Sequence, residues 1–223
     1  MNYKKLYTGL LVALCFAMLP VAKSISAELV APQIVIKNVS DQLKVRMDDE
    51  IFAGDFGRVT EYVDQVVFPI VDFNRISRIV LGPLWKKATA EQKVRFQKEF
   101  KILLVRTYSR AFVEFEEWTI RYLPLKKFSP EVKKVTVRTQ VLQPGIKPIG
   151  VDYKMGFFSG QWKIYDIKIE GISLAINYRT SFKNEIRRSG SSGSSGSLDS
   201  LIDKLAQKNQ KKAAINTAKS SVE

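Results

Sequence analysis

The side chains that most often carry enzyme chemistry are scarce in this chain of 223 residues. It contains no histidine, and its single cysteine, Cys15, lies in an apolar N-terminal run. These counts exclude a Ser-His-Asp set and an ordinary zinc site. The glycines form no phosphate-binding loop either. Carboxylates are therefore the main groups left for acid–base chemistry.

Two aspartates lie among apolar neighbours, Asp72 in the segment 71–85 and Asp166 in the segment 162–169. A buried carboxyl with a raised pKa can act as a general acid or base, so a small-molecule isomerase is one hypothesis. The alternative is structural, with Asp72 as a helix cap and Asp166 as an ion-paired strand residue. The acidic run at 48–50 is too compact for a calcium loop, which needs wider spacing and a glycine turn.

The first 27 residues have the pattern of a secretory signal peptide. Lys4 and Lys5 precede an apolar run over residues 6–22, and small residues follow up to Ala27. We expect cleavage after Ala27, with Ser24 as the second choice. A transmembrane anchor is the alternative, but it needs about 20 apolar residues, and this run is shorter.

Removal of this segment leaves 196 residues without cysteine, which predicts one domain without disulfides in the periplasm. Three of the 36 basic residues and none of the 22 acidic ones lie in the signal, so the remainder carries a net charge of +11. Such a charge attracts nucleic acid or an anionic membrane surface. Nucleic acid is disfavoured because the aromatic residues follow the apolar helix face and the basic residues the opposite one.

The first half of the mature chain has helical spacing. Apolar residues recur every three or four positions over 33–50 and 59–67, and Pro69 ends the second helix. A third helix is predicted to begin at a cap, Asp72 or Asn74, and to stop at Gly82.

A long helix is predicted next. Thr89 and Gln92 fit a capping box, in which each side chain satisfies the backbone N–H of the other residue. The helix is predicted to run to about Trp118, and its apolar sector spans roughly 200°, about twice the stripe of an ordinary surface helix. This width fits either deep packing or the lining of an apolar space. The sector contains Phe96, Phe100, Leu103, Leu104, Val105, Tyr108, Ala111, Phe112 and Phe115.

The second half changes to the period of two that is typical of strands. Strands are predicted around 135–141, 149–157 and 162–169, with turns at Gly145 and at Ser159-Gly160. In the last strand the apolar set changes parity after Ile164, which predicts a β-bulge. This order of elements indicates an α+β fold with helices packed on one face of a curved antiparallel sheet.

The main domain, at 28–188, is predicted to end in a helix, because helical spacing resumes from Ala175 with Ile176, Phe182 and Ile186. Three further parts are predicted beyond it. A glycine–serine linker follows at 189–197, and 198–206 has the spacing of a short amphipathic helix of the same domain. The polar, lysine-rich segment 207–223 is predicted to be a disordered tail.

Two long blocks resemble one protein family. They read VDFNRISRIVLGPLWKKATAEQKVRFQKEFKILLVRTY at 71–108 and SGQWKIYDIKIEGISLAINYRTSF at 159–182. The chain is similar over about 34–206 to the periplasmic phospholipid-binding proteins of the MlaC type, also called toluene-tolerance auxiliary proteins. It departs from them in the glycine–serine stretch, where the family usually has a shorter turn.

The resemblance implies a cone related to nuclear transport factors, with an internal apolar cavity that holds phospholipid tails. It implies no catalysis and no cofactor. The cargo would be a glycerophospholipid, and the partners an outer-membrane lipoprotein–porin complex and an inner-membrane ABC transporter with an MCE-domain subunit. Such a shuttle maintains the lipid asymmetry of the outer membrane. On this reading, fifteen residues are expected to contact the acyl tails: Ile76, Val80, Trp85, Phe100, Leu103, Leu104, Tyr108, Phe112, Val141, Val151, Tyr153, Trp162, Ile164, Ile167 and Ile169.

Overall fold

The computed structural model describes residues 28–49, 51–52, 55–114, 118–125, 128–191 and 197–220. For residues 56, 109–114, 190–191 and 211–220 it describes the backbone only. The predicted signal segment and residues 192–196 of the predicted linker lie outside the described ranges. Among the described helices, none combines the length and the apolar character that a bilayer span requires.

The helices occupy the first half of the chain and its C-terminal end, as the sequence predicts. In chain order they are α1 (Ala31–Met47), α3 (Phe56–Val67), the 3₁₀ turn η1 (Phe68–Ile70), α4 (Phe73–Leu81), α5 (Pro83–Lys87), α6 (Ala90–Glu114), α7 (Leu174–Ser191) and α8 (Leu198–Ser220).

Local capping fixes the starts of α4 and α6. The Asp72 carboxylate accepts the Arg75 backbone N–H at 2.9 Å, so Asp72 is the N-cap of α4. Thr89 and Gln92 exchange the two bonds of a capping box, at 3.0 and 3.1 Å. Both predictions are confirmed. The long helix is described as far as Glu114, and Trp118 lies outside it, directly before the first strand. The predicted end, about Trp118, falls next to residues 115–117, which lie outside the described ranges.

The sheet is an antiparallel meander in the order β1-β2-β3-β4-β5. The first and last strands were not predicted, because they are too short for an alternating pattern to be visible. The Ser159-Gly160 turn has positive φ at both residues, 47° and 79°, as a tight hairpin requires. The strands are β1 (Thr119–Tyr122), β2 (Lys134–Gln143), β3 (Ile146–Phe158), β4 (Gln161–Ile169) and β5 (Ile172–Ser173).

The predicted bulge in β4 is confirmed at Tyr165. Lys154 pairs with Asp166 and the next residue, Met155, pairs with Ile164, so Tyr165 is an extra residue in β4. The Arg75 guanidinium of α4 lies 3.7 Å from the centroid of the Tyr165 ring. The bulge therefore turns an aromatic ring toward α4 and joins the sheet to the helices.

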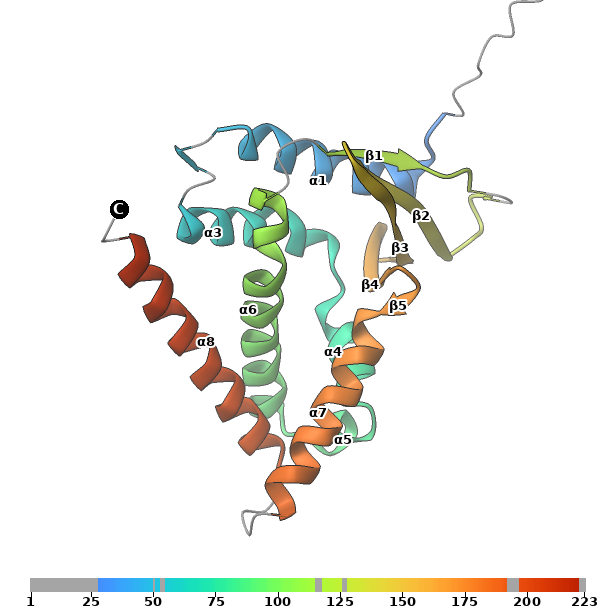
Figure 1. The fold of residues 1–223 in the computed structure, drawn as a ribbon. Helices are drawn as coiled ribbons and strands as arrows, with labels where there is room; N and C mark the ends of the chain where they lie inside the picture. Colours follow the sequence, from blue (N-terminus) through green and yellow to red (C-terminus); the bar gives the residue numbers. More distant parts are fainter. Residues whose placement is uncertain are drawn as a thin grey trace, which may run out of the picture.

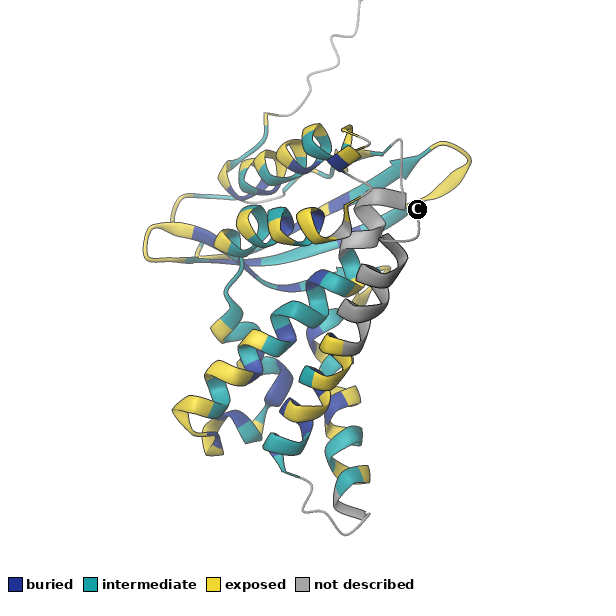
Figure 2. Ribbon diagram, turned by 90° about the vertical axis from the view of Figure 1, so that its left-hand side faces the viewer, coloured by how far each residue is buried: buried dark blue, intermediate teal, exposed yellow. Residues whose placement is uncertain are grey.

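The sheet and α1 lie at one end of the molecule, and α6, α7 and α8 extend away from them (Figure 1). The apolar core has three parts. The first, which we call the helix cluster, consists of buried side chains from α4, α5, α6, α7 and α8. The second, the sheet cluster, consists of Ile36 of α1 and buried side chains of β2, β3 and β4. A third cluster lies between α1, α3 and α6. Exposed residues gather on the outer sides of α1 and α3 and at the hairpin ends (Figure 2).

Helix α8 is longer than predicted. It runs from Leu198 to Ser220, so the prediction of a disordered tail was wrong for residues 207–220. Part of the reason is Asn209, whose buried amide donates to the backbone carbonyl of Glu99 at 3.0 Å and to its carboxylate at 2.7 Å. The apolar side chains at the start of α8 are buried against α6 and its neighbours: Leu198, Leu201, Ile202 and Leu205.

Candidate functional site

The two faces of the sheet have opposite chemistry. Strand pairing brings Val137, Tyr153 and Ile167 side by side, and likewise Thr139, Val151 and Ile169, so these side chains share one face. We call this the inner face, because α1 packs on part of it through Ile36. The opposite, outer face carries basic residues, among them Lys134, Arg138, Lys154 and Lys168.

The helix cluster is closely packed around the N-terminal half of α6. Phe96 and Phe100 are 0% and 1% exposed, and both meet Phe182 of α7 edge-on, with ring centroids 5.9 and 5.7 Å apart. Such T-shaped pairs are a favoured aromatic geometry. Toward the C-terminal half of α6 the coverage becomes incomplete, since Leu103 and Leu104 are only half-buried.

The structure divides the fifteen predicted tail-contact residues into groups by coverage. Phe112 lies where only the backbone is described. Six are buried: Val80, Trp85 and Phe100 in the helix cluster, Trp162 and Ile164 in the sheet cluster, and Val151 on the inner face. Eight are half-buried: Ile76, Leu103, Leu104, Tyr108, Val141, Tyr153, Ile167 and Ile169.

No strand is among the main packing partners of α6 in the described part of the chain. The helix packs instead against α8, α3, α4 and α1. Leu103 and Leu104 pack on the helix cluster, whereas Tyr153 and Ile167 pack on the sheet cluster. The structure therefore does not bring the predicted set together as one packed core.

Tyr153 combines deep burial with incomplete coverage. The pKa of its phenol is raised to about 12, mainly by burial and also by the nearby Tyr122, while a hydrogen bond with Thr139 opposes the rise. Yet the side chain is only half-covered by its neighbours. A ring that is desolvated but not closely packed is what a cavity wall would contain.

Two further tyrosines were not predicted as site residues. The pKa of Tyr122 in β1 is raised to about 12, chiefly by burial, against the opposing effect of a hydrogen bond with Ser40 of α1. Burial raises the pKa of Tyr108 above its ordinary value, and Tyr178 of α7 adds to the rise through its proximity and a hydrogen bond. The four-residue spacing of Tyr178 and Phe182 was a visible signal. The sequence reading used Ile176 instead, which is half exposed, at 50%.

The two candidate acid–base residues are held by structural bonds. Asp166 is 4% exposed, accepts the Ser173 hydroxyl at 2.8 Å and the Ala175 backbone N–H at 3.3 Å, and pairs with Lys154 at 3.3 Å. Asp72 caps α4. These are the structural roles that the sequence analysis gave as alternatives to catalysis. Across the described ranges, no three His, Cys, Asp or Glu side chains are grouped so that they could hold a metal ion.

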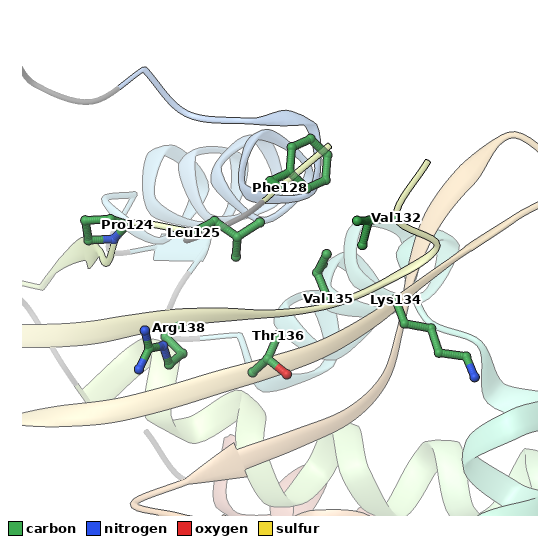
Figure 3. Close-up of a pocket in the computed structure, with 8 residues that line it drawn as sticks. All are labelled: Pro124, Leu125, Phe128, Val132, Lys134, Val135, Thr136 and Arg138. Carbon is green, nitrogen blue, oxygen red and sulfur yellow. The ribbon is translucent and has the colours of Figure 1, made fainter. Parts of the chain in front are cut away.

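Two pockets of modest size lie at the ends of the sheet. One, of about 280 Å³, lies beside β2 and is lined by residues of that strand and of the preceding stretches 124–125 and 128–132 (Figure 3). The other, of about 560 Å³, lies near the β2–β3 turn and includes Trp118, Leu142 and Pro144. Neither lining contains any of the fifteen predicted tail-contact residues.

Comparison with known proteins now decides the family. The family model described as "MlaC protein" matches residues 37–207. The chain belongs to the MlaC family. Among MlaC relatives, the toluene tolerance protein ttg2D of Pseudomonas putida is 27% identical over 220 residues, 96% of each chain. The intermembrane phospholipid transport system binding protein MlaC of Haemophilus influenzae is 25% identical over 182 residues, 79% of this chain and 81% of that one.

A solved structure shares the fold of this MlaC-family chain. It is the phospholipid-binding protein from Ralstonia solanacearum in complex with a phospholipid, with a TM-score of 0.73 and 30% sequence identity. The match covers 82% of this chain and 99% of that one. The predicted α+β fold, with helices on one face of a curved antiparallel sheet, is confirmed.

Proposed function

We propose that this protein is a periplasmic phospholipid carrier that shields acyl chains between the inner face of the sheet and the helices. The observation that carries the proposal is the phospholipid bound to the Ralstonia solanacearum neighbour, which shares 30% of its residues with this chain. The MlaC family membership supports the same cargo class. A carrier performs no covalent chemistry, which agrees with the structural bonds of Asp72 and Asp166.

The physical task of a carrier is to keep acyl chains out of water. At about 0.8 kcal/mol per methylene, two chains of some 14 methylenes each cost roughly 20 kcal/mol when they are exposed. The half-buried apolar residues of the candidate site are suited to this task, because they have surface left to cover. Half-coverage of Leu103 and Leu104 on α6 and of Ile167 and Ile169 on β4 supports a lining role for them.

The proposal therefore refines the predicted set of contacts. The eight half-buried residues would touch the acyl tails, and Tyr153 would form part of the wall. Val80, Trp85 and Phe100 would instead hold the helix cluster together, since they are at most 8% exposed. Phospholipid would be collected from and delivered to membrane complexes, an outer-membrane lipoprotein–porin complex and an inner-membrane MCE-domain ABC transporter.

The test is lipid analysis of the protein purified from the periplasm. Native mass spectrometry should show a bound mass near that of a diacyl phospholipid. Leu104→Asp should purify folded but empty, because it places a charge where the tails would lie. The matched control is Val94→Asp on the same helix, where the side chain is 66% exposed, and it should retain lipid. Gentle preparations that repeatedly carry no lipid would contradict the carrier proposal.

A further inference from the structure

Among the residues that the structure describes, the N-terminal half of β2 has an open strand edge. Strand β1 pairs only with residues 139–142 of β2, and a last bond joins the Leu123 N–H to the Arg138 carbonyl at 3.0 Å. From Lys134 to Val137, pairing in the described part of the chain is with β3 alone. Residues of 124–125 and 128–132, together with β2, line a pocket of about 280 Å³ beside this edge.

The backbone groups that point away from β3 can be assigned from the alternation of a strand. The Lys133 carbonyl accepts the Phe157 N–H at 2.8 Å, whereas the Arg138 carbonyl faces the β1 side. Successive residues point their N–H and C=O groups to opposite neighbours. The N–H and C=O groups of Lys134 and Thr136 therefore point to the open side, where an added strand would find them.

The side chains at this edge separate into a basic set and an apolar set. Lys134, Thr136 and Arg138 leave β2 on one side, whereas Val135 leaves on the other, toward Leu125 and Phe128 (Figure 3). Lys134 and Arg138 are exposed, and neither forms an ion pair with a carboxylate among the residues that the structure describes.

The nearest acidic neighbours do not cancel this charge. Asp152 lies opposite Arg138 in the β2–β3 register, but the two side chains are not within ion-pair distance. The Glu131 carboxylate accepts the Ser129 hydroxyl at 2.6 Å. The Lys133 ammonium lies over the Phe157 ring, 4.7 Å from its centroid, and its positive charge adds to that of the edge.

We propose that this edge binds an extended acidic segment of a partner protein by strand addition. Backbone bonds to Lys134 and Thr136 would supply affinity, and alternating side chains would supply specificity. Acidic residues on one side of the added strand would meet Lys134 and Arg138. Apolar residues on its other side would enter the pocket beside Leu125 and Phe128. The preferred ligand is thus an extended peptide in which acidic and apolar residues alternate.

The charges select this occupant over a second copy of the same chain. Exposed edges pair readily with other edges, and lysine is a common device against such self-pairing. Two copies of this edge would place like charges against each other, which opposes a dimer. An acidic strand meets the same cations favourably, so the residues that prevent self-association also favour the partner.

The decisive variant is Thr136→Pro, with Thr136→Val as its matched control. Proline removes the N–H of Thr136, which points away from β3, so no bond of the sheet is lost. Valine keeps that N–H and suits a strand. The probe is a capped peptide of alternating glutamate and valine, and fluorescence anisotropy measures its binding to the full chain. Control peptides carry lysine for glutamate, or the same composition with the two residue types grouped.

Saturable binding of the alternating acidic peptide, weakened about tenfold by Thr136→Pro and not by Thr136→Val, is the expected result. The double variant Lys134→Glu/Arg138→Glu should reverse the preference toward the lysine peptide, and it keeps the proposal testable if Thr136→Pro misfolds. Bound lipid should be unchanged in all three variants, which separates this proposal from the carrier function. Failure of all peptides to bind, equal binding by the proline variant, a dimer through this edge, or binding only to anionic vesicles would each overturn it.

Discussion

The helix cluster and the inner face of the sheet contain the same kinds of side chains, but neighbouring residues cover them to different extents. In the helix cluster, Phe100 is 1% exposed and meets Tyr178 and Phe182 edge-on, with ring centroids 5.2 and 5.7 Å apart. On the inner face, Ile167 and Ile169 remain half-covered. This difference indicates that the first region provides stability, whereas the second retains apolar surface that a ligand can cover.

The largest effect is expected from a substitution in the closely packed helix cluster. Phe100→Ala should lower the free energy of unfolding by about 3–5 kcal/mol, because it leaves a cavity among rings that cannot collapse into it. Urea denaturation followed by circular dichroism measures the loss. Val94→Ala on the same helix is the control and should stay within about 0.5 kcal/mol of the parent, since Val94 is exposed.

An intermediate effect is expected from a substitution at Leu104, a partly buried residue of α6. Leu104→Ala should destabilise the lipid-free protein by about 1 kcal/mol, because the side chain is only partly buried before any cargo binds. The same change should cost more in the lipid-loaded protein, because the lost tail contact weakens lipid binding and so reduces the stabilisation that bound lipid gives to the folded state. Paired urea titrations of the lipid-free and lipid-loaded forms measure both. A loss of 3 kcal/mol in the lipid-free form would mean that Leu104 is as closely packed as Phe100.

The smallest expected effect concerns the outer side of the helical region, where Lys204 of α8 forms a salt bridge with Glu185 of α7. The hydrogen bond from Lys204 lowers the pKa of Glu185 below its ordinary value of 4.5. The folded state therefore favours the ionised carboxylate. This stabilisation is present at neutral pH and is lost as the pH falls through the lowered pKa of Glu185. Partial exposure limits it to about 0.3 kcal/mol.

Glu185→Gln tests that assignment. Its thermal midpoint should lie slightly below that of the parent at pH 7, and the two midpoints should converge at acid pH, once the parent carboxylate is also protonated. A difference that persists after the parent carboxylate is protonated would show that packing of the glutamine, and not charge, is responsible.

The features that were predictable from sequence are those set by short-range physics. The capping box of Thr89 and Gln92 and the cap at Asp72 depend on residues three positions apart. The bulge at Tyr165 followed from a change of parity within one strand. Each of these signals is complete within a few residues, so tertiary context had little opportunity to override it.

The features that were missed depend on distant partners. Strand β1 has only four residues, and β2 supplies its pairing. The continuation of α8 past residue 206 includes Asn209, whose partner Glu99 lies 110 positions earlier. The extent to which each apolar side chain is buried could not be predicted from the sequence either. Trp85 and Leu104 are both apolar residues on helices of the helix cluster, yet Trp85 is buried and Leu104 is only partly buried.

Docking of α8 on α6 also affects the order in which the molecule can be completed. Synthesis proceeds from the N-terminus, so the buried residues of α8 are made after the α6 residues that they cover: Leu198, Leu201, Ile202 and Leu205. Until α8 has been made, the apolar surface of the helix cluster that it covers is exposed, and exposed apolar surface promotes aggregation. The helix cluster can therefore be completed only after α8 has been made.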